Sequence, residues 1–468
     1  MTNLLNEQKI NVCIQGLGYV GSSLGVALGS AKNNNKLPIF NVIGVEKDTQ
    51  NGKKIIDNIN NGKFPFNTRD KLLIKKFKET YKIGNFKATS SHSAFSKADV
   101  VLVTVNCDIK KKGELLKINL NSFKYCISEF SKKIKESTLV IIESTIPPGT
   151  CEKIVLPVIK KNFHKRKLDP NKIFLAHAYE RVMPGKNYLN SIINNWRVFS
   201  GINKKSSELC ENFLTKFINT KKFPLTRLDN TKSSELSKLM ENSFRAVNIA
   251  FIEEWSRFAE DIGIDIYKVI GAIKQRPTHQ NIQNPGFGVG GYCLTKDPLM
   301  AELCSRTLWK KRNKFLFSNK AVEINNAMPL VSVNKILEFF NNKISGKKFL
   351  LLGASYKEDV DDTRNSPSKI LYSKLLSLKA KVEVHDPLVS FWKEANINPE
   401  KKIPSLKKYD CVIFAVKHQD YNKINLNKWK PAKKNFLFFD ANNVLSSNQI
   451  KIINKSKLNI ISIGRGNE

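Results

Sequence analysis

The chain has 468 residues, of which 41% are hydrophobic, and a formal net charge of +37. Its length predicts two to three domains with ample core, and no apolar run approaches the ~20 residues that a membrane-spanning helix needs. Residues 1–9 lack the basic region followed by an apolar region that marks a signal peptide. Eight cysteines without a Cys-x-x-Cys pair disfavour a zinc site or a disulfide framework and favour a reducing cytoplasm.

The positive charge comes from lysines spread along the whole chain, with short clusters such as Lys160–Lys167. No aromatic residues alternate with them, and a basic chain alone identifies no element that reads a nucleic-acid groove. We therefore expect no nucleic acid and no membrane among the partners. A positive field would still help to attract an anionic small substrate.

A buried strand is predicted over Ile10–Ile14, followed by Gly16-Leu-Gly18-Tyr-Val-Gly21 and a helix from Ser22 to Gly29. This is the G-x-G-x-x-G pattern of a dinucleotide site in its strand–turn–helix setting. The first glycine makes the turn, the second lets the pyrophosphate approach, and the third allows close contact between helix and strand. The predicted cofactor loop comprises Gly16, Gly18, Tyr19, Val20 and Gly21. A glycine turn without phosphate is the alternative.

An acidic residue at the end of the next strand supports this interpretation. The strand is predicted over Asn41–Val45 and ends at Glu46. A carboxylate there would accept hydrogen bonds from the ribose hydroxyls and repel a 2′-phosphate, so NAD is favoured over NADP. Asp48 is a nearby substitute candidate.

Further buried strands are predicted over Val100–Val105, Thr138–Ile142 and Ile173–Ala176, alternating with helices as in a doubly wound parallel sheet. Ligands of such sheets bind beyond the carboxyl ends of the strands. The residues that follow these strands are therefore candidates for a site: Asn106, Glu143-Ser-Thr145 and His177-Ala-Tyr-Glu180-Arg181. The segment Pro147-Pro148-Gly149 breaks the chain, and Thr150 is predicted to cap the next helix.

The most regular helix is predicted from Ser234 to about Ile262. An apolar stripe comprises Leu236, Met240, Phe244, Val247, Phe251, Phe258 and Ile262. The opposite side carries Lys238, Asn242 and Arg245. This arrangement predicts a helix between domains or subunits whose polar row faces a cleft; a solvated polar face is the alternative. Gly263 is the expected C-cap.

The segment from Asn284 to Pro298 contains Gly286, Gly288, Gly290 and Gly291, followed by Cys293. Such dense glycine frees the backbone to turn tightly and approach a ligand. If a helix begins at Leu294, the cysteine lies at its N-terminus, where the partial positive charge favours the reactive thiolate. Lys296 and Asp297 would then share a face with it. A flexible loop with a buried thiol is the alternative.

A second α/β unit is predicted in the C-terminal third. Its strands are expected over Phe349–Leu352, Val382–Val384, Cys411–Val416, Phe436–Phe439 and Ile460–Ile463, with a helix from about Ser368 to Leu378. The turn after its first strand lacks the G-x-G-x-x-G pattern. It offers Lys357 and Arg364 instead, which suit a diphosphate.

Together these stretches resemble the nucleotide-sugar 6-dehydrogenases of the UDP-glucose/GDP-mannose dehydrogenase group. The matching features are the glycine turn, Glu143-Ser-Thr145, Lys238-Leu-Met-Glu-Asn242, the glycine-rich segment through Cys293 to Asp297, and Tyr356-Lys357 with Asp-Asp-Thr-Arg364. The resemblance implies an α/β fold of two Rossmann-like doubly wound parallel sheets joined by a long central helix and a helical middle domain. Residues 1–205 would bind NAD, residues 206–325 would dimerise and carry the catalytic Lys, Asn and Cys, and residues 326–468 would bind the UDP-sugar.

The resemblance also implies a four-electron oxidation of a sugar C6 alcohol to a carboxylate with two NAD⁺. By analogy, Cys293 forms a thiohemiacetal and then a thioester, which water hydrolyses. Lys238 and Asn242 would stabilise the C6 oxygen, and Asp297, Thr145 and Glu180 would orient water or relay protons. Arg364 is assigned to the cofactor. Substrate contacts are assigned to Arg181, Lys238, Asn242, Arg245, Phe287, Gly288, Gly290, Tyr356 and Lys357. No metal is expected. The chain is expected to form a homodimer or higher homo-oligomer.

One departure from the glucose enzymes indicates the substrate. Glu180 is followed by Arg181-Val-Met-Pro184-Gly185, where enzymes similar to UDP-glucose dehydrogenase have Phe-Leu-x-Glu-Gly. This resembles the branch acting on UDP-N-acetylhexosamines (UDP-GlcNAc, UDP-GalNAc or UDP-ManNAc), which feeds surface polysaccharide synthesis. UDP-glucose or GDP-mannose is the alternative. Thr295 stands where the family usually has proline, and this should alter only the stiffness of the loop.

Two other classes share features with this sequence. A non-catalytic NAD-sensing or nucleic-acid-binding Rossmann protein would have lost the reactive groups, whereas Cys293, Lys238, Asn242 and Asp297 are all present. A two-electron hydroxyacid dehydrogenase has no need of a glycine-flanked cysteine. Counting NADH per sugar separates the three classes. A nucleotide-sugar 6-dehydrogenase yields two, a hydroxyacid dehydrogenase one, and a non-catalytic protein none.

Overall fold

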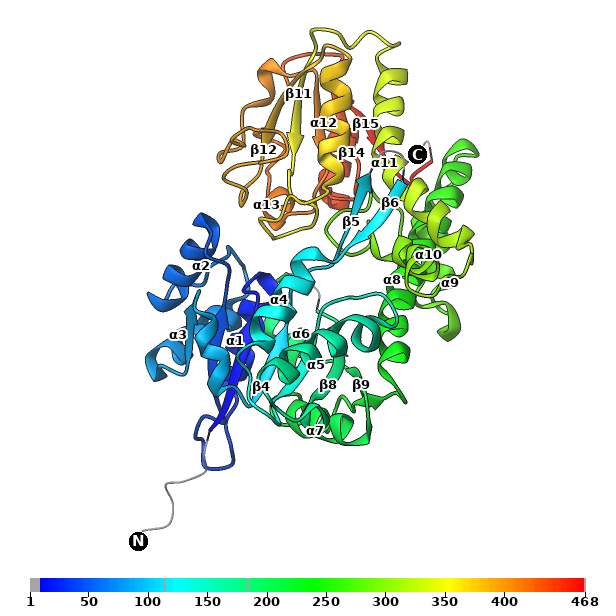
Figure 1. The fold of residues 1–468 in the computed structure, drawn as a ribbon. Coiled ribbons are helices and arrows are strands. Elements are labelled where there is room, and N and C mark those ends of the chain that lie inside the picture. The colour runs from blue at the N-terminus through cyan, green and yellow to red at the C-terminus, as the bar shows by residue number, and fades with distance from the viewer. Residues whose placement is uncertain (1–8, 113–114, 183–184, 467–468) are drawn as a thin grey trace. The chain divides into compact units, whose positions relative to one another are not determined.

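The computed structural model describes residues 9–112, 115–182 and 185–466. It divides into two compact units (Figure 1), the first formed by Met1–Met240 with Met300–Lys314 and the second by Glu241–Leu299 with Phe315–Glu468. The predicted division into three domains stays a prediction. The boundary between the units falls within the long helix α8, Thr231–Asp261.

The first unit is built on an eight-stranded sheet in the order β10-β9-β8-β7-β4-β1-β2-β3. Its strands are β1 Ile10–Gln15, β2 Phe40–Val45, β3 Phe86–Thr89, β4 Val100–Val103, β7 Leu139–Ile142, β8 Phe174–Tyr179, β9 Val198–Gly201 and β10 Thr226–Arg227. Neighbouring strands are parallel except β8 and β9. The strands β4 and β7 are apolar and buried at every position, as expected of parallel strands covered on both faces.

Helices and short turns connect these strands. The helices are α1 Tyr19–Ser30, α2 Gln50–Asn60, α3 Lys71–Ile83, α4 Asn121–Ser131, α5 Leu156–Lys165, α6 Tyr188–Ile193 and α7 Lys204–Leu214, with 3₁₀ turns at His92–Lys97 and Pro170–Lys172 and a π turn at Cys151–Val155. A separate antiparallel hairpin pairs β5 Asp108–Lys112 with β6 Leu115–Asn119. The helix α10, Asp297–Thr307, begins in the second unit and ends in the first.

The second unit contains a five-stranded, wholly parallel sheet in the order β12-β11-β13-β14-β15. The strands are β11 Lys348–Leu352, β12 Lys381–His385, β13 Cys411–Phe414, β14 Leu437–Asp440 and β15 Asn459–Ser462. The helices are α9 Ile266–Ile273, α11 Leu316–Phe339, α12 Pro367–Ser377, α13 Gln419–Asn422 and α14 Ser447–Lys455, with 3₁₀ turns at Pro277–His279 and Leu406–Lys408. Alternate residues of β11 enter different hydrophobic clusters. Leu351 belongs to one cluster, and Leu350 and Leu352 belong to the other, so the sheet is covered on both faces. The predicted α/β fold class is confirmed.

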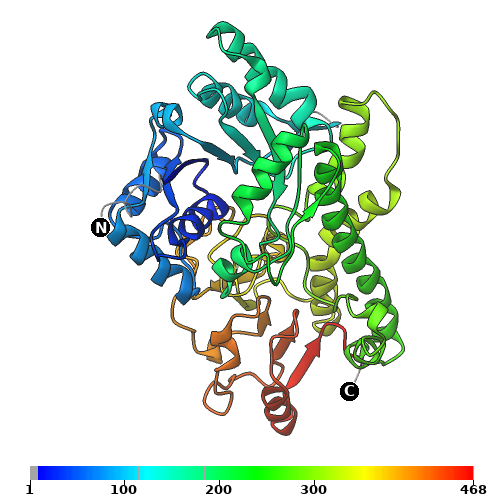
Figure 2. The ribbon, with the colours of Figure 1, turned by 90° about the horizontal axis from the view of Figure 1, so that it is seen from below.

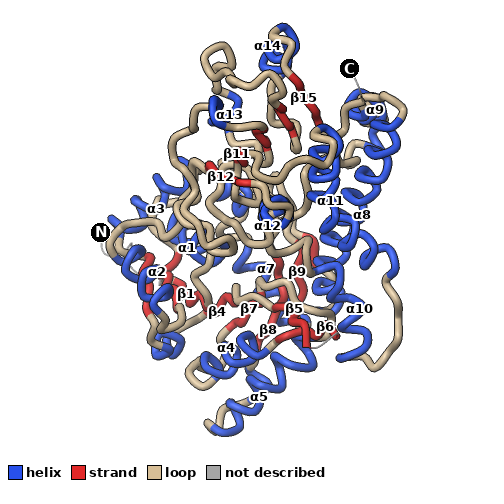
Figure 3. Tube along the Cα trace, turned by 90° about the horizontal axis from the view of Figure 1, so that it is seen from above, coloured by secondary structure: helices blue, strands red, loops and turns tan. Residues whose placement is uncertain are grey.

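The helix α8 carries the predicted apolar stripe, but apart from Val247 the stripe does not pack within the chain. Six of its seven residues, together with Trp255, are between 47% and 67% exposed; only Val247 is half-buried. The opposite side, where small residues such as Ala246 and Ala250 face Ala321, packs against α11, beside which α8 runs (Figure 2, Figure 3). As predicted, Gly263 follows the helix end in the left-handed conformation (φ 74°).

Candidate functional site

The glycine turn after β1 has the predicted strand–turn–helix form. Gly16 has φ +97°, and a Cβ on Gly21 would lie 2.0 Å from the carbonyl oxygen of Gly16, so both positions require glycine. A Cβ on Gly18 would meet nothing within 4 Å, which leaves that side of the turn open. The hydroxyl of Thr104, at the end of β4, donates to the oxygen of Gly16 at 2.7 Å. The sequence interpretation did not include this threonine, because it pairs with the turn across 88 residues.

Glu46 lies beside the same turn. Its carboxylate accepts the amide hydrogens of Leu17 at 2.5 Å and Lys47 at 2.9 Å. Asp48, the substitute candidate, is exposed and pairs with Lys53 at 3.2 Å instead. Glu46 is therefore the acidic residue that contacts the glycine turn.

Tyr19 and Val20 open α1, as predicted, but the tyrosine ring packs inward. Its centroid lies 4.7 Å from that of Tyr188 and 5.2 Å from that of Phe66. The helix start has Gly18 as N-cap without a side-chain hydrogen bond. The group that Tyr19 presents at the open turn is therefore its backbone amide in the first turn of α1.

Lys238 and Glu180 come together in the first unit. The Lys238 Nζ donates to the carbonyl oxygen of Glu180 at 2.7 Å and lies 5.1 Å from the ring centroid of Tyr179. The Tyr179 hydroxyl lies 2.7 Å from Ser237 Oγ, which joins β8 to α8. The Glu180 carboxylate accepts the amide hydrogen of Val182. The lysine is 8% exposed, so it is held by groups at the end of β8.

The Glu143-Ser-Thr145 segment follows β7. Glu143 forms a buried ion pair with Arg197 at 2.5 Å, and burial raises the pKa of its carboxyl while Arg197 opposes the shift. The Ser144 hydroxyl donates to the oxygen of Val105 at 2.6 Å. Thr145 is half-buried at the end of this segment. Arg197 was not predicted, since nothing local in the sequence pairs it with Glu143.

Two groups at these strand ends are structural. Burial lowers the pKa of His177 to about 3, and its Nδ1 lies 2.8 Å from Ser234 Oγ, so the ring is neutral and does not titrate near pH 7. The prediction that Thr150 caps a helix is wrong, because its hydroxyl donates to the oxygen of Pro147 at 2.6 Å. The cap comes from α8 instead: the buried Glu235 carboxylate accepts the amide hydrogens of Gly149 at 2.5 Å and Cys151 at 2.8 Å.

In the second unit, the predicted position of Cys293 at a helix N-terminus is wrong. The helix α10 begins at Asp297, and the intervening residues form a turn in which Cys293 O accepts the amide hydrogens of Lys296 at 3.1 Å and Asp297 at 2.9 Å. An Asp-Pro pair, here Asp297-Pro298, is typical of a helix start and was the overlooked signal. Cys293 is exposed, whereas the other seven cysteines, all within the described residues, are buried.

Asp297 links the cysteine turn to α8. Its fully buried carboxylate accepts a hydrogen bond from Asn242 Nδ2 at 2.7 Å and pairs with Lys296 Nζ at 2.7 Å. The lysine also lies 4.3 Å from the ring centroid of Tyr292. The structure therefore brings Asn242 and Asp297, both predicted as catalytic, into direct contact.

The glycines before Cys293 make room for the chain itself. A Cβ on Gly290 or Gly291 would lie 2.6 Å or 2.8 Å from Tyr356, and one on Gly288 would lie 2.9 Å from Pro367. Phe287 is 3% exposed and packs in a core cluster of the second sheet, so its ring does not line a surface, and its predicted contact with the substrate stays a prediction. At these glycines the backbone therefore lies close to side chains of the same chain, Tyr356 and Pro367.

The loop after β11 docks on the cysteine loop through its backbone. The Gly291 amide donates to Arg364 O at 2.9 Å, and Asn365 Nδ2 donates to Gly291 O at 2.9 Å. The Arg364 guanidinium donates to Asp362, at 2.9 Å from Nε and 2.5 Å from Nη2, and its Cζ lies 5.5 Å from the Tyr292 ring centroid. The hydrogen bond to Asp362 raises the pKa of Arg364 against the effect of burial, and the charges of Asp362, Tyr356 and Cys293 add to the shift.

Two other predicted cations of the second unit act on each other. Burial lowers the pKa of Lys357, Glu358 opposes this, and the positive charge of Arg245 lowers it further. A half-buried lysine near an arginine suits an anionic ligand. In the first unit, Arg181 donates to the oxygen of Trp196 at 3.2 Å and lies 5.7 Å from the Tyr179 ring. Pro184, on which the substrate prediction also depends, lies outside the described residues.

Among the described residues, no group of three or more His, Cys, Asp or Glu side chains could hold a metal ion. In the same part of the chain, every helix is too short or too polar to cross a membrane.

Comparison with known proteins identifies the relatives of this chain. Residues 10–218 match the NAD binding domain of the UDP-glucose/GDP-mannose dehydrogenase family, residues 232–327 its central domain and residues 350–447 its UDP binding domain. The UDP-N-acetyl-D-mannosamine dehydrogenases of Methanocaldococcus jannaschii and Methanococcus vannielii are each 31% identical, covering 93% and 98% of this chain and 92% and 98% of their own. The solved UDP-D-ManNAc dehydrogenase of Pyrococcus horikoshii aligns with TM-score 0.81 and 26% identity over 98% of this chain and 100% of that one.

Proposed function

The chain belongs to the UDP-glucose/GDP-mannose dehydrogenase family and is an NAD-dependent oxidoreductase, and on this premise we propose that it oxidises the C6 hydroxyl of a UDP-sugar to a carboxylate. The observation that carries the proposal is the contact of Asn242 with Asp297, four residues after the exposed Cys293. A thiol, a carboxylate and an amide on one loop and its supporting helix are what a covalent two-stage oxidation requires.

Bound NAD⁺ supplies the hydride acceptor for each of the two oxidations. Gly16–Gly21 and the first turn of α1 would hold its diphosphate and Glu46 its ribose, since the turn is open at Gly18 and the carboxylate adjoins Leu17. Arg364 would add a cation once a phosphate displaces Asp362 from its guanidinium.

The side chains of the protein divide the remaining work. The Cys293 thiolate adds to the C6 carbon of the aldehyde to form a thiohemiacetal, whose oxidation leaves a thioester. Water then attacks that carbon and the thiolate leaves, which releases the carboxylate. Lys238 has three N–H donors, one of which is used on Glu180, and with Asn242 it would stabilise the C6 oxygen. Asp297, Glu180 and Thr145 would orient the water or relay its protons.

The preferred substrate is a UDP-N-acetylhexosamine whose uronic acid product feeds surface polysaccharide synthesis. The Glu180-Arg181 segment favours it, and so do the names of the two archaeal relatives. Lys357 and Arg245 would bind the diphosphate, and Arg181, Tyr356 and the backbone of Phe287–Gly290 the rest of the substrate. UDP-glucose and GDP-mannose remain the alternatives, and a cytoplasmic location stays a prediction from the cysteine composition.

A second copy of the chain is proposed to cover the apolar stripe of α8. The stripe repeats every 11 residues, as in Leu236, Val247 and Phe258, so it runs nearly straight along the helix. A two-fold axis presents the same surface on both copies, and a straight stripe on a 31-residue helix can pair with itself. The exposure of large apolar side chains on one face supports this homodimer.

One assay tests the oxidation. Purified protein is incubated with NAD⁺ and limiting amounts of UDP-GlcNAc, UDP-GalNAc, UDP-ManNAc, UDP-glucose or GDP-mannose, and NADH is counted per sugar. Two NADH per N-acetylated sugar are expected, with a higher kcat/KM than for UDP-glucose. One NADH per sugar would identify a two-electron dehydrogenase, and none with any sugar would leave only a non-catalytic role.

A further inference from the structure

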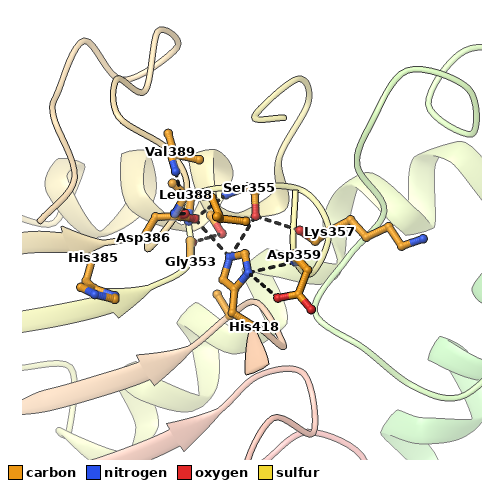
Figure 4. Close-up of polar contacts among 12 residues, drawn as sticks. Gly353, Ser355, Lys357, Asp359, His385, Asp386, Leu388, Val389 and His418 are labelled. Atoms are coloured by element: carbon orange, nitrogen blue, oxygen red, sulfur yellow. Dashed lines mark hydrogen bonds and ion pairs between the residues drawn. The ribbon is translucent and has the colours of Figure 1, made fainter. Parts of the chain in front are cut away.

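A buried histidine lies against the loop that carries Lys357. His418 follows β13 and precedes α13, and its ring is 0% exposed (Figure 4). It contacts Ser355, Asp359 and Asp386, which come from the loop after β11 and from the end of β12. None of these residues belongs to the predicted site.

The hydrogen bonds determine which ring nitrogen carries the hydrogen. The amide of Asp359 donates to Nδ1 at 3.0 Å, and because a backbone amide can only donate, Nδ1 is the acceptor. The hydrogen is therefore on Nε2, which lies 3.3 Å from Asp386 Oδ2 and 3.2 Å from Ser355 Oγ. The Ser355 hydroxyl donates its own hydrogen to Lys357 O at 2.9 Å.

This arrangement is not that of a nucleophilic serine. In a Ser-His-Asp triad, the serine and the carboxylate contact opposite ring nitrogens, and the histidine accepts the serine proton. Here Ser355 and Asp386 both contact Nε2, and the serine hydrogen is directed to a carbonyl oxygen. The cluster therefore holds the backbone in place.

Asp386 anchors the cluster to the sheet. Its Oδ2 accepts the amide hydrogens of Ala354 at 2.8 Å and Ser355 at 3.2 Å, and its Oδ1 accepts those of Leu388 and Val389 at 2.9 Å each. Four amide hydrogen bonds and one from His418 Nε2 compensate for the burial of this carboxylate. The carboxylate is thus a permanent acceptor for the start of the loop.

Asp359 has an unfavourable backbone conformation that this cluster stabilises. Its φ is +58°, in the left-handed region that non-glycine residues seldom occupy. The ring of His418 holds its amide, and Gln419 Nε2 donates to its carboxylate at 2.6 Å. Ser355 and Asp359 lie two residues on either side of Lys357, so one imidazole fixes the backbone before and after this lysine. Figure 4 shows the Lys357 side chain pointing away from the cluster.

We propose that His418 is a positioning residue for diphosphate binding: by holding Ser355 and Asp359, it directs the Lys357 side chain toward the ligand. The inference rests on the proposed function, because the diphosphate is that of the UDP-sugar. It names a residue 61 positions away from the lysine, which no local motif connects to it.

The two ring nitrogens can be tested separately. In His418→Asn, the amide oxygen can take the place of Nδ1 and still accept from Asp359. In His418→Gln, the longer side chain reaches the position of Nε2 and leaves the Asp359 amide without its acceptor. His385→Asn is the matched control, since His385 is another buried histidine of this sheet edge whose Nδ1 lies 3.1 Å from the Tyr421 hydroxyl.

UDP and NAD⁺ affinities are measured by calorimetry on the full chain, with thermal melting as the check on folding. His418→Gln should weaken UDP binding about tenfold, the factor expected for one lost buried hydrogen bond, with NAD⁺ binding unchanged. The KM for the UDP-sugar should rise with little change in kcat. His418→Asn should recover most of the UDP affinity, and His385→Asn should bind UDP as the wild type does.

The double variant His418→Gln/Asp359→Gly adds a rescue, because glycine adopts a positive φ without the support of His418. Its UDP affinity should exceed that of His418→Gln. Wild-type UDP affinity in His418→Gln, or an equal loss of UDP and NAD⁺ affinity, overturns the inference while the proposed function stands. Failure of the wild type itself to bind UDP overturns both.

Discussion

The amide of Gly291 donates to the carbonyl oxygen of Arg364 at 2.9 Å, so the backbone two residues before Cys293 is joined directly to the loop that carries Lys357. Both segments belong to the second unit. Under the proposed function, this bond connects the loop that binds the diphosphate with the loop that carries the nucleophile. The two loops are therefore coupled through a backbone hydrogen bond, and this coupling does not depend on a side chain.

The first prediction concerns Cys293. Cys293→Ala should abolish steady turnover at two NADH per sugar, because no other exposed thiol exists among the eight. Cys293→Ser should release at most one NADH per active site rapidly, since an alkoxide forms far less readily than a thiolate. Any ester formed should hydrolyse slowly and be detected as a sugar adduct by intact-mass spectrometry.

Both cysteine variants should bind NAD⁺ and UDP like the wild type, because the NAD⁺ contacts are assigned to Gly16–Gly21, Glu46 and Arg364 and the diphosphate contacts of UDP to Lys357 and Arg245. Sustained turnover by Cys293→Ala would rule out the thioester route. Loss of NAD⁺ and UDP binding would instead indicate that the cysteine supports the loop.

The second prediction concerns cofactor choice. The wild type should prefer NAD⁺ to NADP⁺, and Glu46→Ala should relax the preference, since it removes both the ribose acceptor and the repulsion of a 2′-phosphate. Asp48→Ala is the control, because Asp48 pairs with Lys53 and should leave the ratio of kcat/KM values unchanged. Comparable wild-type kcat/KM for the two cofactors would contradict the role of Glu46.

The third prediction concerns α8. The wild type should sediment as a dimer or larger oligomer, above the 53.2 kDa of one chain. Phe244→Glu should shift it toward the monomer, because a charge in the middle of an apolar interface is desolvated without a partner. Phe391→Glu changes another phenylalanine more than half exposed, outside the stripe, and should leave the mass unchanged. A wild-type monomer at micromolar concentration would refute the interface.

The fourth prediction concerns Glu235. Burial raises the pKa of its carboxyl to about 7, against the hydrogen bonds from Cys151 and Gly149. In the unfolded state the carboxyl has its ordinary pKa near 4.5 and loses its proton above that pH, whereas the folded state keeps the proton up to about pH 7. Stability from this group is therefore present below about pH 4.5 and is lost as the pH rises to about 7, by roughly 3 kcal/mol at 1.36 kcal/mol per unit.

Thermal midpoints at pH 5 and pH 8 test this sign. The wild type should lose more stability between these values than Glu235→Gln, whose side chain does not titrate. An equal loss in the two proteins would show that Glu235 does not contribute to the pH dependence. At pH 5, Glu235→Gln should be less stable than the wild type, because its side chain has one acceptor oxygen in place of the two that serve Gly149 and Cys151.

Several elements of the site were predictable because their signals are local. The turn from Gly16 to Gly21 needs a positive φ at one glycine and no Cβ at another, and both needs arise within six residues between a buried strand and a helix. Glu46 was predictable for the same reason, since it ends the strand paired directly with β1. The stripe of α8 follows from helical periodicity alone.

Whether a predicted surface is covered, and by what, was decided only by tertiary structure. Periodicity places Phe244 and Phe258 on one face of α8, but both remain exposed because alanines on the other face make the contacts within the chain. The sequence did not show that the Phe287 ring enters the core or that Tyr356 lies beside Gly290 and Gly291.

The sequence by itself determined the glycine turn, the two α/β units and the presence of Cys293, Lys238 and Asn242, because each depends on spacing within one segment. Tertiary structure alone decided that Glu235 caps a turn 84 residues away, and that His418 holds Asp359 across 59 residues. The reason is physical: a buried donor or acceptor must find a partner, but its partner can come from any segment that folding brings within hydrogen-bond distance.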